Sequence, residues 1–270
     1  MLRRLEQYLL QRTPEGIALA YSGGVDSTLL LAVLSRLYRR RQFPFAVLTM
    51  RTVLQNDAEM ADAENLAAQF AAEQKFFTFN PFSLEAVRYN RIDRCYHCKK
   101  AIFTRFRDYA RSRGLTHLLD GTNADDVKQY RPGRKALKEL GVISPLAELE
   151  IDKASIRRMS AELGLPTASK PAAPCLATRF EYDTLLDDDI IRRVAAGEDA
   201  VRTMFPELKT VRLRVHGSLA RLEVPAERLS EVAAQGKAVA EMLKNLGFDY
   251  ITLDLEGFRS GSFDKGLKQN

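Results

Sequence analysis

The sequence predicts an α/β protein with a doubly wound, mostly parallel sheet, followed by a smaller C-terminal α+β domain. In the first half, short apolar runs alternate with helical patterns, which is typical of repeated βα units. A glycine-rich turn at residues 22–27 joins the first apolar run to a helical pattern. After the Pro- and Ala-rich stretch 166–174, alternating strands and long helices follow. We therefore expect a first domain over residues 1–180 and a second over 181–270.

The predicted elements of the first domain follow from hydrophobic spacing and from capping residues. The chain opens on an amphipathic helix, because Leu2, Leu5, Leu9 and Leu10 recur at helical spacing. Strands are expected at 16–21, 45–49, 75–79 and 117–120. Helices are expected at 28–38, from Asn56 or Asp57 to 69, around 102–109 up to Gly114, and at 153–163.

The second domain is predicted to combine three strands and two helices. A long helix is expected from 184 to 204, and two alternating strands, 211–216 and 219–224, are joined at Gly217 and Ser218. One helix over 226–246 and a last strand at 249–255 complete the unit.

The composition is that of a soluble globular protein, with 46% hydrophobic and 28% charged residues. No stretch approaches the about 20 apolar residues that span a bilayer, and the N-terminus lacks a signal-peptide core. We expect a cytoplasmic protein without a membrane partner. The net charge is +6, and residues 88–113 are strongly basic. This stretch is either a solvated helix face or a surface that attracts a phosphate-bearing small molecule or RNA.

The turn at 22–27, Ser-Gly-Gly-Val-Asp-Ser, predicts a phosphate site. It aims backbone N–H groups and a helix N-terminus at one point, and its glycines let the backbone approach an anion. It is neither a Walker loop nor GxGxxG. It is similar to the PP-loop of ATP pyrophosphatases, which implies cleavage of ATP between the α and β phosphates. We expect ATP to contact Ser22, Gly23, Gly24, Val25, Asp26, Ser27, Thr49, Gly121, Asn123 and Asp125.

The chain has three cysteines, Cys95, Cys98 and Cys175. An odd number in a cytoplasmic chain argues against a disulfide framework. Four interpretations remain: three unrelated buried thiols, a zinc site completed by His97, a redox pair, or a [4Fe-4S] cluster with one iron left open. Arg179, four residues after Cys175, is a cation that could lower the pKa of that thiol.

Together these motifs resemble one branch of the PP-loop enzymes, the ATP-dependent sulfur transferase family LarE. The matching segments span nearly the whole chain and are residues 22–27, 94–100, 120–126, 131–133, 144–146, 170–171, 175–179 and 211–215. Thr178 stands where the family usually has serine. The resemblance implies that the protein adenylates a carboxylate of pyridinium-3,5-biscarboxylic acid mononucleotide. It also implies that the protein then replaces oxygen by sulfur, in the biosynthesis of the nickel-pincer nucleotide of lactate racemase.

The resemblance also implies roles for single residues. Cys175 matches the sulfur-bearing cysteine, and we expect it to act with Asp26 and Arg179 in catalysis. Cys95, Cys98 and Cys175 together match the three-cysteine subset, in which a [4Fe-4S] cluster carries the donated sulfide. Mg²⁺ is expected to neutralise the phosphates of ATP during transfer. Its organisers would be Asp26 and either Asp125 or Asp126, although the latter two also suit helix capping.

Arg212 and Arg214 lie two apart on one face of a predicted strand, so they can clamp the phosphate of a mononucleotide. The family has arginines with this role at the matching positions. The alternative is an exposed strand face with salt bridges. Glu198 and Glu223 match family positions that bind a metal.

The expected cofactors are ATP, Mg²⁺ and a [4Fe-4S] cluster. The expected partners are the mononucleotide substrate, other lactate racemase maturation proteins and further copies of the chain, but not nucleic acid. Two rival functions stay open. A tRNA thiolase would use the basic stretch 88–113 to follow an RNA backbone. A zinc-stapled nucleotide-binding regulator would use the cysteines without catalysis.

Overall fold

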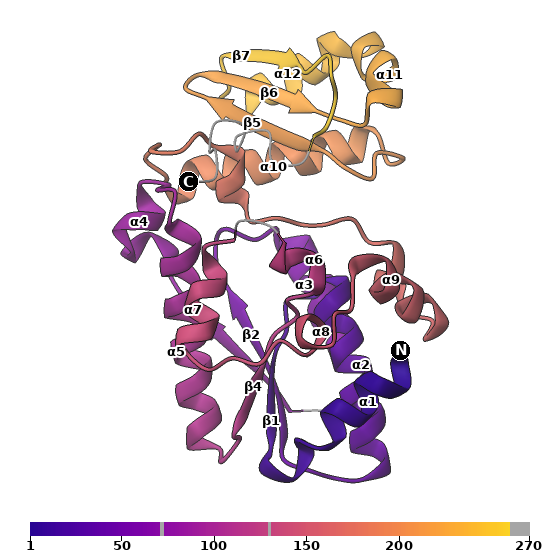
Figure 1. The fold of residues 1–270 in the computed structure, drawn as a ribbon. Coiled ribbons are helices and arrows are strands. Elements are labelled where there is room, and N and C mark those ends of the chain that lie inside the picture. The colour runs from indigo at the N-terminus through magenta and orange to yellow at the C-terminus, as the bar shows by residue number, and fades with distance from the viewer. Residues whose placement is uncertain (71–72, 129–130, 260–270) are drawn as a thin grey trace. The chain divides into compact units, whose positions relative to one another are not determined.

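The computed structural model describes residues 1–70, 73–128 and 131–259 (Figure 1). The chain divides into two compact units. The N-terminal unit comprises Met1–Pro81 and Asp93–Ala173, and the C-terminal unit comprises Phe82–Ile92 and the chain from Pro174 onward. The C-terminal unit thus takes in a segment from the first half of the sequence that hydrophobic spacing did not indicate.

The N-terminal unit contains a four-stranded, wholly parallel sheet in the order β3-β2-β1-β4 (Figure 1). Ile17 of β1 lies level with Phe45 on one side and with His117 on the other. The chain adds β2 and β3 on one side of β1 and β4 on the other, so the predicted doubly wound sheet is confirmed. The strands are β1 (Ile17–Ala20), β2 (Phe45–Arg51), β3 (Glu73–Thr78) and β4 (His117–Leu119).

Helices cover both faces of this sheet. Ile17 and Leu19 lie in a core with residues of α1 (Leu2–Leu10), α2 (Val25–Arg40), α3 (Asp57–Ala68) and α9 (Lys153–Glu162). Ala18, between them, lies in a second core with residues of α5 (Arg94–Ser112) and α7 (Gly133–Glu139). Side chains alternate along a strand, so burial on both faces produces the continuous apolar run seen in the sequence.

Two helix ends in this unit follow the predicted capping residues, whereas the start of α5 differs from the prediction. Asn56 caps α3 by accepting hydrogen bonds from the N–H groups of Ala58 and Glu59, at 2.9 and 3.2 Å. Gly114, with φ +67°, follows the end of α5 as predicted. However, α5 begins at Arg94 and therefore includes the cysteine pair, which the sequence placed before this helix.

The C-terminal unit contains a mixed three-stranded sheet in the order β5-β6-β7. Its strands are β5 (Arg212–His216), β6 (Leu219–Glu223) and β7 (Tyr250–Leu253). The first two form an antiparallel hairpin, whereas β7 runs parallel to β6. The hairpin places Arg212 directly opposite Glu223.

Two helical predictions for this unit were wrong in their boundaries. The helix expected from residue 184 is α10 (Asp188–Met204), because the Asp187 carboxylate accepts the Ile190 N–H at 2.9 Å and caps it. The single helix expected over 226–246 is divided. Gln235 leaves the helical conformation with φ −104° and ψ 19°. The parts are a 3₁₀ turn (Ala226–Arg228), α11 (Leu229–Ala234) and α12 (Gly236–Asn245).

Residues 82–92, with the short helix α4 (Glu85–Arg88), join the C-terminal unit through Asn90. The buried Asn90 amide donates hydrogen bonds to the carbonyls of Phe180, at 3.2 Å, and Glu181, at 2.7 Å. Its φ of +48° is one that asparagine adopts more readily than most residues. The Leu186 N–H also donates to the Arg88 carbonyl at 2.7 Å, and Arg91 pairs with Asp183 at 2.6 Å, so several contacts bind this distant segment to the unit.

Short helices complete the two units: η1 (Thr13–Glu15), η2 (Pro81–Ser83), α6 (Ala124–Val127), α8 (Pro145–Glu148), η3 (Pro166–Ser169) and η4 (Leu176–Arg179). Within residues 1–70, 73–128 and 131–259, no helix has both the length and the apolar character needed to cross a membrane.

Candidate functional site

The glycine-rich segment 22–27 comprises the turn after β1 and the first residues of α2, which begins at Val25 rather than at the predicted residue 28. It lies where the chain has added strands to one side of β1 and then adds β4 on the other. Residues 121–123 follow β4, the strand next to β1. In open α/β sheets, ligands bind at the carboxyl ends of the strands at such a switch point. The two loops meet there, because a Cβ on Gly121 would lie 3.1 Å from the Ser27 backbone nitrogen. The structure therefore brings together residues 22–27 and residues 121–123, two segments that are both expected to contact ATP.

The two glycines of the loop differ in what requires them. Gly23 has φ +71°, and a Cβ there would lie 2.3 Å from the Cβ of Ala63 in α3. Gly24 has an ordinary φ of −76° and is the N-cap of α2. A Cβ on Gly24 would meet only the Ser22 hydroxyl oxygen, at 3.6 Å. The fold thus requires glycine at position 23. At position 24 it does not, and the missing side chain leaves space beside the Ser22 hydroxyl.

The hydroxyl groups at this site differ in burial. Ser27 is buried, and its Oγ lies 3.2 Å from the Gly24 carbonyl oxygen and 3.2 Å from the Ser22 Oγ. Ser22 is exposed, so its hydroxyl can contact a ligand. Thr49 of β2 is buried, and within the described residues its Oγ1 has no hydrogen-bond partner.

Asp26 is the carboxylate of this site. Its Oδ2 accepts a hydrogen bond from the ammonium of Lys153 at 2.6 Å, and its Oδ1 accepts one from the Asn123 amide at 3.2 Å. These residues come from three elements: the first turn of α2, the loop after β4 and the first residue of α9. Asn123 therefore lies beside the glycine-rich segment, and its expected contact with ATP stays a prediction.

Asp125 and Asp126 organise the loop after β4. The Asn123 side chain accepts the N–H groups of both, at 2.9 and 3.1 Å, and the Asp126 carboxylate accepts the Asn123 N–H at 3.2 Å. This is a capping box at the start of α6. Asp125 Oδ2 also accepts the Lys153 N–H at 2.9 Å, which joins α6 to α9. The helix-capping interpretation thus describes Asp126, whereas Asp125 fixes the position of Lys153.

Cys95 and Cys98 lie in the first turns of α5, three residues apart and hence on one side of the helix. Cys95 is exposed and Cys98 is half-buried. Tyr96, between the two cysteines, donates a hydrogen bond to Glu139 of α7 at 2.9 Å. The Lys100 ammonium donates to the Tyr96 hydroxyl and to the Glu139 carboxylate, each at 2.9 Å. These contacts join the first turns of α5, with the cysteine pair, to α7.

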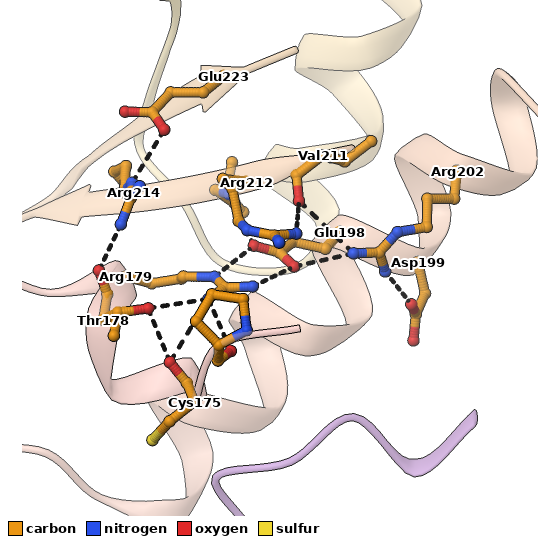
Figure 2. Close-up of polar contacts among 12 residues, drawn as sticks. Cys175, Thr178, Arg179, Glu198, Asp199, Arg202, Val211, Arg212, Arg214 and Glu223 are labelled. Carbon is orange, nitrogen blue, oxygen red and sulfur yellow. Dashed lines mark hydrogen bonds and ion pairs between the residues drawn. The ribbon is translucent and has the colours of Figure 1, made fainter. Parts of the chain in front are cut away.

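Cys175 precedes η4 in the C-terminal unit and is exposed (Figure 2). The buried Arg179 guanidinium holds this segment. Its Nη1 donates to the carbonyls of Pro174 and Cys175, at 3.0 and 3.4 Å, and to the Thr178 hydroxyl at 2.9 Å. Its other nitrogens donate to Glu198 at 2.8 and 3.0 Å. In this structure the Arg179 side chain therefore fixes the backbone that carries the thiol.

None of the three cysteines, all within the described residues, forms a disulfide. No three His, Cys, Asp or Glu side chains in the described part of the chain come together as a metal site. The predictions of a cluster on the three thiols and of a metal at Glu198 and Glu223 stay predictions.

Glu198 of α10 is almost fully buried and accepts four hydrogen bonds. Two come from Arg179, one from Arg202 at 3.1 Å and one from the Leu213 N–H at 3.0 Å (Figure 2). Burial opposes ionisation of this carboxyl, but the hydrogen bonds and charge of Arg179, with the charge of Arg212 and the Leu213 N–H, hold its pKa below the usual value of 4.5. Glu198 is therefore an ionised centre of the arginine network.

Arg212 and Arg214 of β5 are both buried, which differs from an exposed strand face. Arg212 Nη1 donates to the Val211 carbonyl at 2.8 Å. Arg214 donates to the Glu223 carboxylate at 3.0 Å and to the Thr178 carbonyl at 2.5 Å (Figure 2). Burial lowers the pKa of Arg214, although the Glu223 charge opposes this effect. The two arginines therefore lie in the same network as the segment that carries Cys175.

Within the N-terminal unit, basic residues of the stretch 88–113 have acidic partners. Lys100 pairs with Glu139 at 2.9 Å, and Arg113 pairs with Glu73 at 3.1 Å. These exposed pairs agree with a solvated helix surface.

Lys153 is the site residue that the sequence analysis missed. It was assigned only as the start of a helix, yet its ammonium contacts Asp26. A signal was present, because a cation at the first position of a helix is unfavourable with respect to the helix dipole and thus requires another reason.

A wholly parallel sheet with the Ser-Gly-Gly-Val-Asp-Ser turn at its switch point defines a PP-loop-like α/β protein. No family model matches the chain. The chain is 36% identical to the pyridinium-3,5-bisthiocarboxylic acid mononucleotide synthase of Lactiplantibacillus plantarum, over 93% of its own length and 90% of that of the synthase. The chain therefore belongs to the LarE family.

Two uncharacterised proteins are similar over nearly the same extent. One, from Synechocystis, is 35% identical over 92% of the length of this chain and 92% of its own length. The other, from Methanocaldococcus jannaschii, is 27% identical over 90% of the length of this chain and 91% of its own length.

Proposed function

We propose that this protein adenylates a carboxylate of pyridinium-3,5-biscarboxylic acid mononucleotide with ATP and then converts it to a thiocarboxylate. The single observation that carries the proposal is the 36% identity to the Lactiplantibacillus plantarum synthase over 93% of the chain. The use of ATP is supported by the loop at residues 22–27, which turns a helix N-terminus toward the switch point of the sheet.

In the first step, a carboxylate oxygen of the substrate attacks the α-phosphorus of ATP. The bond from this phosphorus to the oxygen shared with the β-phosphate breaks, and pyrophosphate leaves with the electron pair. The N–H groups of the loop and the exposed Ser22 hydroxyl would stabilise the charge on the phosphates. Asp26 is the partly exposed carboxylate that would hold Mg²⁺, which neutralises phosphate charge when bound.

In the second step, sulfur attacks the carbonyl carbon of the acyl-adenylate, and AMP leaves with the electron pair of the broken C–O bond. We propose that Cys95, Cys98 and Cys175 hold a [4Fe-4S] cluster. Their thiols suit it, because none is in a disulfide and two lie three residues apart on one helix. Such a cluster supplies an iron whose open position takes an exogenous sulfide. Arg179 orients the Cys175 backbone through the hydrogen bonds described above.

Arg212 and Arg214 are proposed to bind the substrate phosphate. Both guanidiniums are held in place, by the Val211 carbonyl and by Glu223 respectively. An orientation fixed before binding reduces the entropy lost when a phosphate is captured. Glu198 and Glu223 would then act chiefly by orienting arginines.

The test is the product pattern of the purified protein with ATP, Mg²⁺ and the biscarboxylate mononucleotide. We expect AMP and pyrophosphate in amounts that depend on the mononucleotide. Ser22→Ala should slow their release, and Asp26→Asn should nearly abolish it, because the loop loses a phosphate donor or its only carboxylate. Ser112→Ala is the matched control, since this exposed hydroxyl at the end of α5 donates to the Tyr109 carbonyl at 2.8 Å and lies in no part of the proposed site.

ADP and orthophosphate as first products would overturn the adenylation step. AMP release that depends on tRNA and not on the mononucleotide would favour the tRNA thiolase.

A further inference from the structure

Lys153 reaches from the first residue of α9 to the carboxylate at the start of α2. Its Nζ lies 2.6 Å from Asp26 Oδ2, and its backbone N–H donates to Asp125 at 2.9 Å. Asp152, the N-cap of α9, fixes the residue from the other side by accepting the Ser155 N–H at 2.8 Å. The lysine stem is thus anchored at its base while the ammonium lies at the switch point of the sheet.

Stability does not explain this arrangement. A lysine in the first turn of a helix opposes the helix dipole by roughly 0.3–1 kcal/mol. The ion pair is partly exposed, with 37% of the Lys153 side chain and 20% of the Asp26 side chain accessible, so its net contribution is of the same small size. The two terms nearly cancel. A cation that adds little stability, at the place where the loop favours phosphate, indicates a role in binding.

We propose that Lys153 is a nucleotide-binding residue whose ammonium exchanges between two anions, the Asp26 carboxylate and the phosphates of ATP. In the free protein it neutralises Asp26. With ATP and Mg²⁺ present, the Asp26 carboxylate would hold the metal and the Lys153 ammonium would turn to the phosphates. This inference rests on the proposed use of ATP, and it adds a residue and an order of contacts to that function.

The charges of the site support an exchange of partners. Without Lys153, the Asp26 carboxylate would face the anionic phosphates with no cation at hydrogen-bond distance among the described residues other than the metal that ATP brings. Asn123, which also donates a hydrogen bond to Asp26, is an uncharged amide. The four-carbon stem of lysine has enough rotamers to move its ammonium by several ångströms without backbone movement. One cation can therefore serve both anions in turn.

The test is isothermal titration calorimetry of the full chain with α,β-methylene-ATP, which cannot be cleaved at the α–β position. With Mg²⁺, Lys153→Met should raise the Kd about 10- to 100-fold, because a charge-assisted hydrogen bond to phosphate is lost. Lys153→Arg should recover part of this loss. Lys128→Met is the matched control: Lys128 lies 3.7 Å from Asp125, is 77% exposed and should leave the Kd unchanged.

A second measurement separates binding from a merely structural role. Asp26→Asn removes the competing carboxylate and releases the ammonium, so binding of the nucleotide without Mg²⁺ should become several-fold tighter than in the wild type. This variant also keeps the test valid if Lys153→Met does not fold.

The outcomes distinguish this inference from the proposed function. If the wild-type protein does not bind the nucleotide, both fall. If the wild type binds and Lys153→Met binds equally well, or if Asp26→Asn does not tighten metal-free binding, the exchange is refuted and the proposed function stands.

Discussion

Replacing the two loop glycines by alanine, one at a time, should separate folding from nucleotide binding. At Gly23, alanine must adopt φ +71° and place its Cβ 2.3 Å from the Ala63 Cβ. The left-handed conformation costs a residue with a Cβ about 1–2 kcal/mol. Forcing a methyl group into a packed contact costs typically about 1–3 kcal/mol. Gly23→Ala should therefore lower the free energy of unfolding by about 2–5 kcal/mol.

At Gly24 the same substitution meets no such obstacle. The residue has φ −76°, and its Cβ would lie 3.6 Å from the Ser22 Oγ, an ordinary contact. Alanine restricts the unfolded chain, which stabilises by about 0.4–1 kcal/mol, but it is a poorer N-cap than glycine by a similar amount. The stability of Gly24→Ala should thus stay within about 1 kcal/mol of the wild type, while the added methyl group stands beside the Ser22 hydroxyl and weakens nucleotide binding at least tenfold.

The assays are urea unfolding followed by circular dichroism, and calorimetric titration with α,β-methylene-ATP and Mg²⁺. The decisive comparison is between the change in unfolding free energy and the change in nucleotide Kd. If the loop served only as a turn, the folded forms of both variants would bind the nucleotide equally well. Wild-type nucleotide affinity in Gly24→Ala, or a wild-type unfolding midpoint in Gly23→Ala, would refute the reasoning.

Two further predictions concern the C-terminal unit and the cysteines. Glu198→Gln should lower the free energy of unfolding at neutral pH by about 3–5 kcal/mol, because Arg179 is left buried without its carboxylate. Since Glu198 has a lowered pKa, its stabilisation is present above the usual value of 4.5 and is lost as the pH falls below it; urea midpoints across this range should fall for the wild type and less for the variant. Anaerobically prepared protein should turn over repeatedly with added sulfide and keep Cys175 intact by mass spectrometry, and serine at Cys95, Cys98 or Cys175 should abolish this; colourless protein that transfers one sulfur and loses that of Cys175 would contradict the cluster.

Much of the N-terminal unit could be predicted because its signals are local. The run around Ile17–Ala20 is apolar throughout because both faces of β1 are covered, and Asn56 caps α3 through its own side chain. The start of α5 could not be predicted, since the hydrogen bonds of Tyr96 and Lys100 to Glu139 join residues about forty positions apart. The same holds for residues 82–92, which Asn90 ties to Phe180 and Glu181.

The sequence by itself determined the class of the sheet, the position of the glycine-rich turn and the family, because apolar periodicity, a glycine-rich turn and the order of motifs are properties of short segments. Only the tertiary structure decided which side chains meet. It gave Asp26 a lysine partner from α9 and gave Glu198 two arginines. It also buried Arg212 and Arg214, which alternation alone left open to either face. The physical reason is that a charge in low dielectric is stable only beside its partner, and the partners here come from segments that folding alone brings together.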